Sequence, residues 1–263
     1  MREKNIGEGY YSYWNQFVQD WVNGVKLGPR GLLNSDQPGD LSRRYIPEPW
    51  WGNDGRKPLY SVCLNLNPGQ GDPHLQRRCK ILSSGYHQYS DLFNILSATD
   101  RWHNNKRALP IRRALRIPLS HPTKAIENHL SIELIPWHTK NATSKMGYRK
   151  YIASHIIEIF NYSFSFAAVE SAKIKGKLNS TVIFRFSGET AEWLFDLFKK
   201  NQLLDDYTSY SLDEQLTNPN VHARLFRTPQ FPDNKFVAIW RSKGYGLNNF
   251  PGEASMIEIL SLV

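Results

Sequence analysis

Residues 58–69 read PLYSVCLNLNPG, a short apolar run that stops at the turn-forming sequence NPG. An apolar run of this length, bounded by turn residues, is typical of a strand that is buried on both faces of a sheet. Three further runs have the same form, at residues 130–137, 181–186 and 235–240. We therefore predict four short buried strands at these positions.

Segments with apolar residues at helical spacing lie before and between the predicted strands. The predicted helices cover residues 10–25, 76–84, 91–98, 148–172 and 189–200. Strands that alternate with helices favour right-handed crossovers and parallel pairing. We expect a single α/β domain over residues 1–263, with a short, mainly parallel four-stranded sheet flanked by helices. Residues 1–46 would form an N-terminal helix and an irregular lead-in.

Polar loops follow all four predicted strands. In mainly parallel sheets, ligands bind beyond the carboxyl ends of the strands. The loops that begin at Asn67, His138, Ser187 and Arg241 are therefore expected to converge on one cleft.

The chain has a formal net charge of +9, which favours a polyanionic partner such as DNA, although a basic surface can also serve solubility alone. Its two cysteines, Cys63 and Cys79, are too few for a disulfide framework, a four-cysteine zinc site or an iron-sulfur cluster. We expect no metal and no cofactor. Residues 1–17 lack the apolar stretch of a signal peptide, and no window is apolar enough for a membrane span. We expect a cytoplasmic monomer.

Several motifs occur in a fixed order along the chain: PEPWWG at 47–52, NLNPG at 65–69, IELIPWH at 132–138 and FSGETA at 186–191. Together they resemble the uracil-DNA glycosylase superfamily, particularly its mismatch-specific branch, over about residues 47–250. The chain departs from the family twice. Asn65 stands where the family has a glycine, and RSKG at 241–244 stands where the family has its last motif, His-Pro-Ser.

The resemblance implies a uracil-DNA glycosylase-like fold and hydrolysis of a base-to-sugar bond in DNA. That reaction passes through an oxocarbenium-like sugar and needs a positioned water more than a strong nucleophile. Asn67 matches the family residue that holds this water, and His138 is the candidate donor to the departing base. The alternatives are that NPG only makes a turn and that His138 is an ordinary loop residue. Because no lysine stands in a setting typical of a Schiff-base nucleophile, we expect a monofunctional enzyme that leaves an abasic site.

Four residues are candidates for binding the base: Asn65, Tyr86, Glu133 and Ser187. Glu133 stands where uracil-processing relatives carry an asparagine, and its carboxylate would accept hydrogen bonds from the exocyclic amine of a cytosine-like base. The alternative is an ion pair between Glu133 and a nearby basic residue. Tyr86, or Tyr89, would stack on a base that has been flipped out of the duplex, unless it belongs to the core.

Two basic segments are candidates for contacting DNA phosphates. The first is the run at 101–116, which contains Arg112 and Arg113, and the second is the loop formed by Arg241, Ser242 and Lys243. In relatives, that last loop holds the extruded nucleotide out of the stack.

The expected substrate is a damaged or modified pyrimidine, since some members of this group are thought to act in phage defence by removing modified cytosines. Two alternatives stay open. One is a DNA-binding module that kept the fold and lost the chemistry, and the other is a hydrolase of free nucleosides or nucleotides.

Overall fold

The computed structural model describes residues 4–22, 41–42, 48–53, 57–65, 108–118, 127–134, 138–139, 145–185, 188–205, 208–242 and 251–263. The strands in these ranges are β1 (Leu41–Ser42), β2 (Trp50–Gly52), β3 (Ser61–Asn65), β4 (His129–Glu133), β5 (His138–Thr139), β6 (Thr181–Arg185), β7 (Tyr210–Ser211), β8 (Val221–Thr228) and β9 (Phe231–Arg241).

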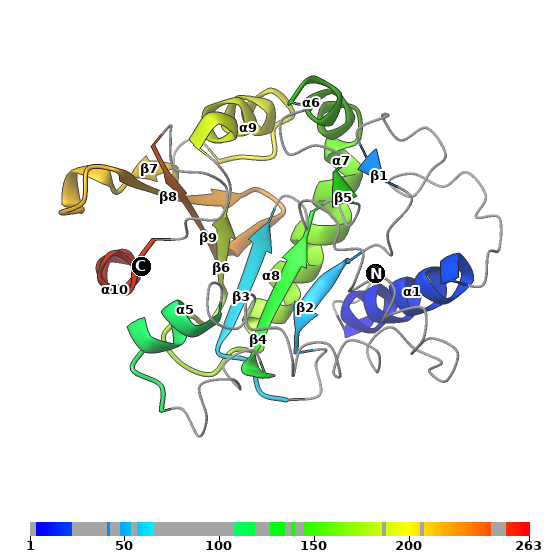
Figure 1. Ribbon diagram of the computed structural model, residues 1–263, viewed down its shortest axis with the longest axis horizontal. Coiled ribbons are helices and arrows are strands. Elements are labelled where there is room, and N and C mark those ends of the chain that lie inside the picture. Colours follow the sequence, from blue (N-terminus) through cyan, green and yellow to red (C-terminus); the bar gives the residue numbers. More distant parts are fainter. Residues whose placement is uncertain are drawn as a thin grey trace.

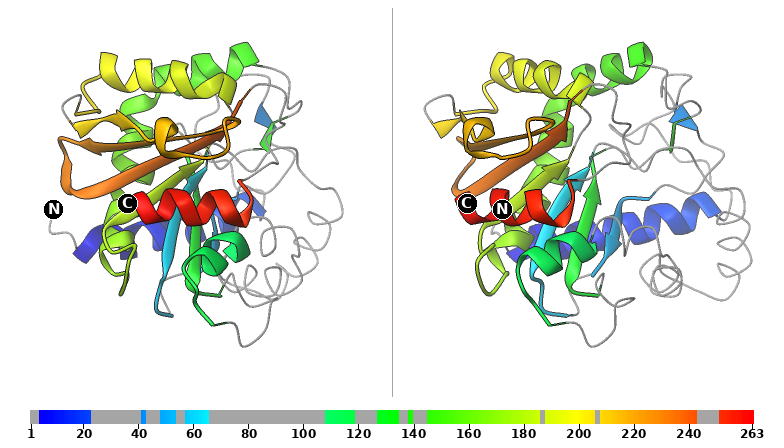
Figure 2. Two further views of the ribbon diagram at one scale, coloured as in Figure 1. Left: turned by 90° about the vertical axis from the view of Figure 1, so that its left-hand side faces the viewer. Right: turned by 60° about the vertical axis from the view of Figure 1, so that its left-hand side comes forward.

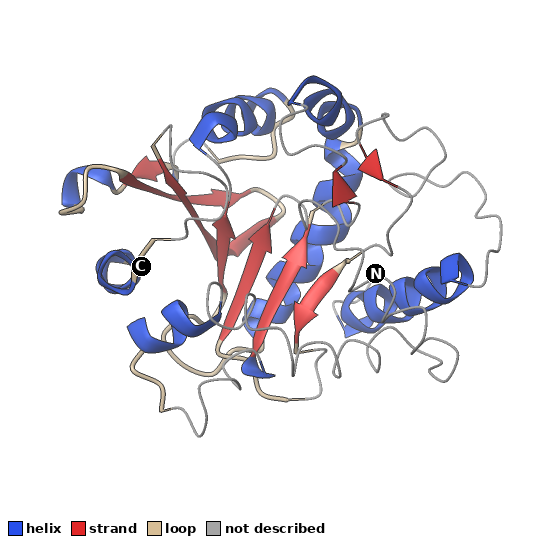
Figure 3. Ribbon diagram, in the orientation of Figure 1, coloured by secondary structure: helices blue, strands red, loops and turns tan. Residues whose placement is uncertain are grey.

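The helices in the same ranges are α1 (Lys4–Val22), α5 (Leu109–Ala114), α6 (Lys145–Ser154), α7 (Ile156–Ile159), the π-helical turn η4 (Phe160–Phe164), α8 (Ser165–Ala172), α9 (Gly188–Lys200), the 3₁₀ turn η6 (Asp213–Gln215) and α10 (Glu253–Leu262). Figure 3 shows these helices arranged around a central sheet. The α/β class that the sequence predicts is therefore confirmed.

The main sheet has seven strands in the described part of the chain, in the order β2-β4-β3-β6-β9-β8-β7 (Figure 1). β4, β3, β6 and β9 are neighbours that run parallel. β2 pairs antiparallel with β4 at one edge, and β8 and β7 add antiparallel strands at the other. The expected sheet of four strands was therefore too small, and the sheet is mixed.

The three extra strands have weak sequence signals. β2 is only three residues long and directly follows a segment that the sequence marks as irregular. β8 reads VHARLFRT, and its alternation of buried and partly buried residues breaks where Leu225 and Phe226 are both buried. A two-residue turn at 229–230 then joins β8 to β9, because Thr228 pairs with Phe231. The expected fourth strand is thus the second half of a long hairpin.

The second expected strand, 130–137, ends earlier than predicted. β4 stops at Glu133, whereas His138 lies in β5, which pairs with β1 in a separate two-stranded sheet. Parallel pairing between β3 and β4 ends at the same point, where Asn65 faces Glu133. The carboxyl end of this strand is therefore Glu133 and not Trp137.

Three of the predicted helical regions are confirmed. α1 and α9 match the first and last of them, and residues 148–172 fall within the run from α6 to α8, which contains the π-helical turn. The predicted helices at 76–84 and 91–98 lie outside the described residues. The sequence did not indicate α10, which packs against α5 (Figure 2).

One face of the sheet packs against α8, which contacts β3, β6 and β9, and α1 lies against α8 in turn. This face carries the apolar residues of the strands, such as Val62, Leu64 and Phe184, all fully buried. Phe164 packs edge-on against Phe184, with ring centroids 5.4 Å apart. None of the helices in the described ranges has both the length and the apolar character needed to cross a membrane.

Candidate functional site

The opposite face of β3 and β4 is polar although it is buried. Residues that face each other in parallel register point to the same side of the sheet, and three such pairs alternate with the apolar residues: Ser61 with His129, Cys63 with Ser131, and Asn65 with Glu133. All six side chains are buried, and all but Cys63 are polar. Parallel strands covered on both faces are usually apolar throughout, because a buried polar group costs free energy unless it is hydrogen-bonded. Polar residues at these positions therefore require a specific role.

Hydrogen bonds link the two strands along this face. Ser61 Oγ lies 2.8 Å from His129 Nδ1. Asn65 Nδ2 donates to Ser131 Oγ at 2.7 Å and to the carbonyl of Ile132 at 3.3 Å. These contacts turn the amino group of Asn65 back along the sheet. They fix the orientation of the amide at the carboxyl end of β3.

Among the residues that the structure describes, none bonds the other end of the Asn65 amide. Asn65 is 4% exposed, and its Oδ1 atom has no hydrogen-bond partner among the residues that the structure describes. Most buried polar atoms in folded proteins are hydrogen-bonded, so an exception calls for an explanation. A buried acceptor beside Glu133, at the carboxyl edge of a parallel sheet, is suited to receive a donor from a ligand.

Arg185 extends the Asn65–Glu133 pair into a row of three. It ends β6 and pairs in register with Asn65, so a carboxylate, an amide and a guanidinium end three adjacent strands. Neighbouring strands lie about 4.8 Å apart, which is the scale of a planar heterocycle. The sequence did not single out Arg185. The signal was available, because Arg185 is the one charged residue in the apolar run TVIFRF.

The order of the strands also favours this place. The chain passes from β3 to β4 on one side and then crosses to β6 on the other side of β3. At such a reversal the two crossover connections leave the sheet in opposite directions, and ligands bind in the crevice between them. Asn65 and Arg185 are the last residues of the two strands at this reversal.

β2 contributes an indole to the same face. Trp51 pairs in register with Ser131, and its Nε1 donates to Glu48 Oε2 at 2.7 Å. Both residues are buried. The sequence marked this segment as a motif without assigning roles, and the structure places Trp51 on the side of β4 away from Asn65.

Four predicted site residues lie outside the described residues: Asn67, Tyr86, Ser187 and Lys243. In the sequence, Asn67 comes two residues after Asn65, the last residue of β3. His138 is placed by its backbone alone, opposite Ser42 of β1. Of the predicted base-binding set, the structure thus brings together Asn65 and Glu133.

Arg112, one of the predicted DNA contacts, is not on an exposed surface. It is 8% exposed, its guanidinium carbon lies 5.3 Å from the ring centre of Tyr60, and it donates to the carbonyl of Pro118. Burial raises the pKa of Tyr60, and the nearby Arg112 opposes that rise. The geometry therefore gives Arg112 a role in packing α5. Its neighbour Arg113 is exposed and lies 3.6 Å from Glu253 of α10.

The predicted contacts Arg241 and Ser242 lie at the end of β9, both partly buried. Ser242 is held by its backbone N–H, which donates to the carbonyl of Asn220 at 3.0 Å. Within the described residues, no three His, Cys, Asp or Glu side chains gather closely enough to hold a metal ion.

Comparison of the chain with protein-family models, curated proteins and solved structures found no match. The resemblance to the uracil-DNA glycosylase superfamily therefore stays a prediction from the motifs.

Proposed function

We propose that this chain is a monofunctional DNA glycosylase that removes a modified cytosine. The observation that supports the proposal best is the pairing of two buried polar side chains, Asn65 and Glu133, at the carboxyl ends of adjacent parallel strands. The basic net charge of +9 favours a nucleic-acid substrate over a free nucleoside.

The chemistry of the row favours a base with an exocyclic amine. Glu133 and the Oδ1 atom of Asn65 can accept the two hydrogens of one amine, whereas Arg185 can only donate hydrogen bonds. Cytosine carries a donor, its 4-amino group, at one end of its pairing edge and an acceptor, its carbonyl, at the other. Uracil has a carbonyl in place of the amine and would oppose the carboxylate of Glu133.

The hydrolytic step is assigned to Asn67 on the strength of the motif. An amide can orient a water molecule without titrating, and the oxocarbenium-like sugar needs little more than that water and stabilisation of the departing base. His138 is the proposed donor to the departing base. The base must leave the duplex to reach a row at the strand ends, which costs a few kcal/mol that DNA contacts offset.

An excision assay on DNA tests the proposal. Oligonucleotides and phage DNAs carrying uracil, G·T mismatches, hydroxymethylcytosine or glucosylated hydroxymethylcytosine are incubated with the protein, and abasic sites are scored as alkali-induced breaks. We expect breaks in DNA with a modified cytosine and their loss in Asn67→Ala.

Glu133→Gln tests whether the carboxylate recognises the exocyclic amine of the base. Because the amide presents a donor where the carboxylate accepted, we expect excision to fall about 10- to 100-fold. The matched control is Glu127→Gln. Glu127 lies just before the start of β4, at the other end of the strand, where it is paired with Lys57 at 2.8 Å, and its replacement should leave excision unchanged.

Two outcomes would replace the proposal. Salt-sensitive DNA binding without breaks in any substrate would favour the non-catalytic module. Hydrolysis of free nucleosides without action on DNA would favour the nucleoside hydrolase.

A further inference from the structure

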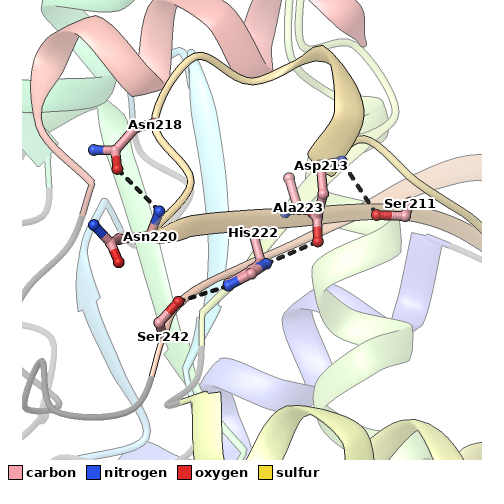
Figure 4. A network of polar contacts seen from close by, with 7 residues as sticks. All are labelled: Ser211, Asp213, Asn218, Asn220, His222, Ala223 and Ser242. Atoms are coloured by element: carbon pink, nitrogen blue, oxygen red, sulfur yellow. Dashed lines mark hydrogen bonds and ion pairs between the residues drawn. The ribbon is translucent and has the colours of Figure 1, made fainter.

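An acid, an imidazole and a hydroxyl from three segments meet beside the hairpin of β8 and β9 (Figure 4). Asp213 lies in η6, His222 in β8 and Ser242 directly after β9. His222 Nδ1 lies 2.8 Å from Asp213 Oδ2, and His222 Nε2 lies 2.8 Å from Ser242 Oγ. The three side chains therefore form one continuous chain of hydrogen bonds.

Each ring nitrogen of His222 faces a different partner, and this arrangement determines the chemistry that the network can perform. A carboxylate on Nδ1 favours the tautomer that carries its proton on that nitrogen, which leaves Nε2 as the acceptor. Nε2 then accepts the hydroxyl proton of Ser242. This is the order of contacts that makes a serine hydroxyl nucleophilic in hydrolases with a Ser-His-Asp triad, which is recognised by geometry and not by chain order.

The acid is held firmly in place. Asp213 Oδ1 accepts the backbone N–H of Ala223 at 2.9 Å, and the backbone N–H of Asp213 donates to Ser211 Oγ at 3.1 Å. The carboxylate is thus fixed at one oxygen while the other orients the imidazole. Fixed orientation is what an acid in this position contributes to catalysis.

The imidazole of His222 packs against the hairpin on one side and remains partly accessible to solvent. His222 pairs with Trp240 across the hairpin, and the two rings stack with centroids 5.6 Å apart. Trp240 in turn contacts Phe195 of α9. The His222 side chain is 27% exposed and that of Asp213 38%. The ring is therefore held against the hairpin while a small molecule can still approach it.

We propose that Ser242 is the nucleophile of a second active site, which hydrolyses small carboxylic esters. Ser242 Oγ attacks the carbonyl carbon while His222 Nε2 takes the hydroxyl proton. The tetrahedral adduct collapses, the ester C–O bond breaks, and the leaving alcohol takes that proton from His222. His222 Nε2 then deprotonates a water molecule that attacks the acyl carbon. The bond between that carbon and Ser242 Oγ breaks, Oγ takes the proton back from His222, and the carboxylic acid is released.

This site is distinct from the row at Asn65. Ile239 pairs in register with Arg185, so Ser242 lies three residues beyond the row along β9, about 10 Å at 3.3 Å per residue. It is also two strands away from Asn65 in the sheet order, roughly a further 10 Å. The backbone N–H of Ser242 is bonded to Asn220, so the developing oxyanion must be stabilised by other donors.

A fluorophosphonate probe tests the proposal directly, because it labels activated serines. The full-length protein is incubated with the probe, and the labelled residue is identified by peptide mass spectrometry. We expect label on Ser242, none in Ser242→Ala, and hydrolysis of p-nitrophenyl acetate that falls to background in the same variant. Asp213→Asn should slow both reactions about 10²- to 10⁴-fold.

Ser154→Ala is the matched control, because Ser154 is an exposed serine of α6 that lies outside the network. It should keep wild-type labelling of Ser242. His222→Ala should lose the label, and a cooperative thermal unfolding transition, with its Tm measured on the same sample, shows that this variant is folded. Either an unlabelled Ser242 in folded wild-type protein or undiminished labelling in folded His222→Ala would overturn the proposal and leave the network a structural clamp of the hairpin.

Discussion

Glu170 is a fully buried acid in α8. It lies on the side of the sheet away from the polar row, which is formed by Asn65, Glu133 and Arg185. Burial raises the pKa of its carboxyl group, because the charged form loses its hydration. Lys173, three residues later on the helix, opposes this rise through a hydrogen bond and its charge. The acid therefore holds its proton more tightly in the folded protein than in the unfolded chain.

This difference predicts a fall in stability with rising pH. Between the unfolded pKa, about 4.3, and the raised folded pKa, the folded protein binds more protons, so the free energy of unfolding decreases as pH rises. Glu170→Gln removes the titration and keeps an acceptor for Lys173. We expect the Tm of the variant to exceed that of the wild type at neutral pH, and the gap to vanish below about pH 4.3.

Thermal unfolding of both proteins from pH 4 to pH 9 measures the gap. The control is Glu192→Gln, an exposed acid on α9, which should show no such trend. A Tm difference for Glu170→Gln that does not change with pH would mean that this carboxyl group is not responsible.

At the scale of the elements, α1 is attached to the domain through aromatic rings. Tyr10 of α1 and Phe166 of α8 stack with their centroids 3.9 Å apart and their planes 8° from parallel. Tyr10 also packs against Trp50 of β2. The N-terminal helix thus rests on the helix that supports the parallel strands.

Removing one ring should loosen this attachment. We expect Phe166→Ala to lower the free energy of unfolding by about 3–5 kcal/mol, because Phe166 is fully buried. Tyr162→Ala is the control from the adjoining turn. Tyr162 is 56% exposed, so the loss should stay below about 1 kcal/mol. Urea denaturation gives both values, and equal losses would show that the stack contributes nothing specific.

The sequence was sufficient to predict a strand or helix where the periodicity of its apolar residues and its flanking turn residues agree. Continuous apolar runs predicted β3 and β6, and helical spacing predicted α1 and α9. The same signals failed for β8, whose alternation breaks where Leu225 and Phe226 are both buried. β4 was placed correctly but extended too far, because the apolar residues continue past Glu133 although the pairing with β3 stops there.

The candidate sites show the same limit. Asn65 and Glu133 were found because each stands in a motif, but that they lie side by side follows from the register of β3 and β4, which neither strand reveals alone. Arg185 was missed although its charge within the apolar run TVIFRF was a usable signal. The Asp213, His222 and Ser242 network depends on how the hairpin pairs His222 with Trp240, and sequence spacing alone does not bring those three residues together.

At the scale of the whole molecule, the charge of +9 makes a prediction about DNA that does not depend on catalysis. Each phosphate contacted by a basic side chain releases a counterion, so the logarithm of affinity should fall linearly with the logarithm of salt concentration, by about 0.9 per contact. Fluorescence anisotropy with a labelled duplex from 50 to 200 mM salt measures this slope. An affinity that is flat over this range would contradict a DNA-binding role.

Two variants locate the contacts that produce the slope. Arg241 ends β9 at the same edge of the sheet as the polar row, and Arg241→Ala should make the slope shallower by about 0.9 if it contacts one phosphate. Lys57 lies before the start of β3, at the amino ends of the parallel strands, where it is paired with Glu127. Lys57→Ala should leave the slope unchanged. The reverse result would place DNA at the amino ends of the strands, where the row of Asn65, Glu133 and Arg185 could not reach a flipped base, and would thereby argue against the proposed site.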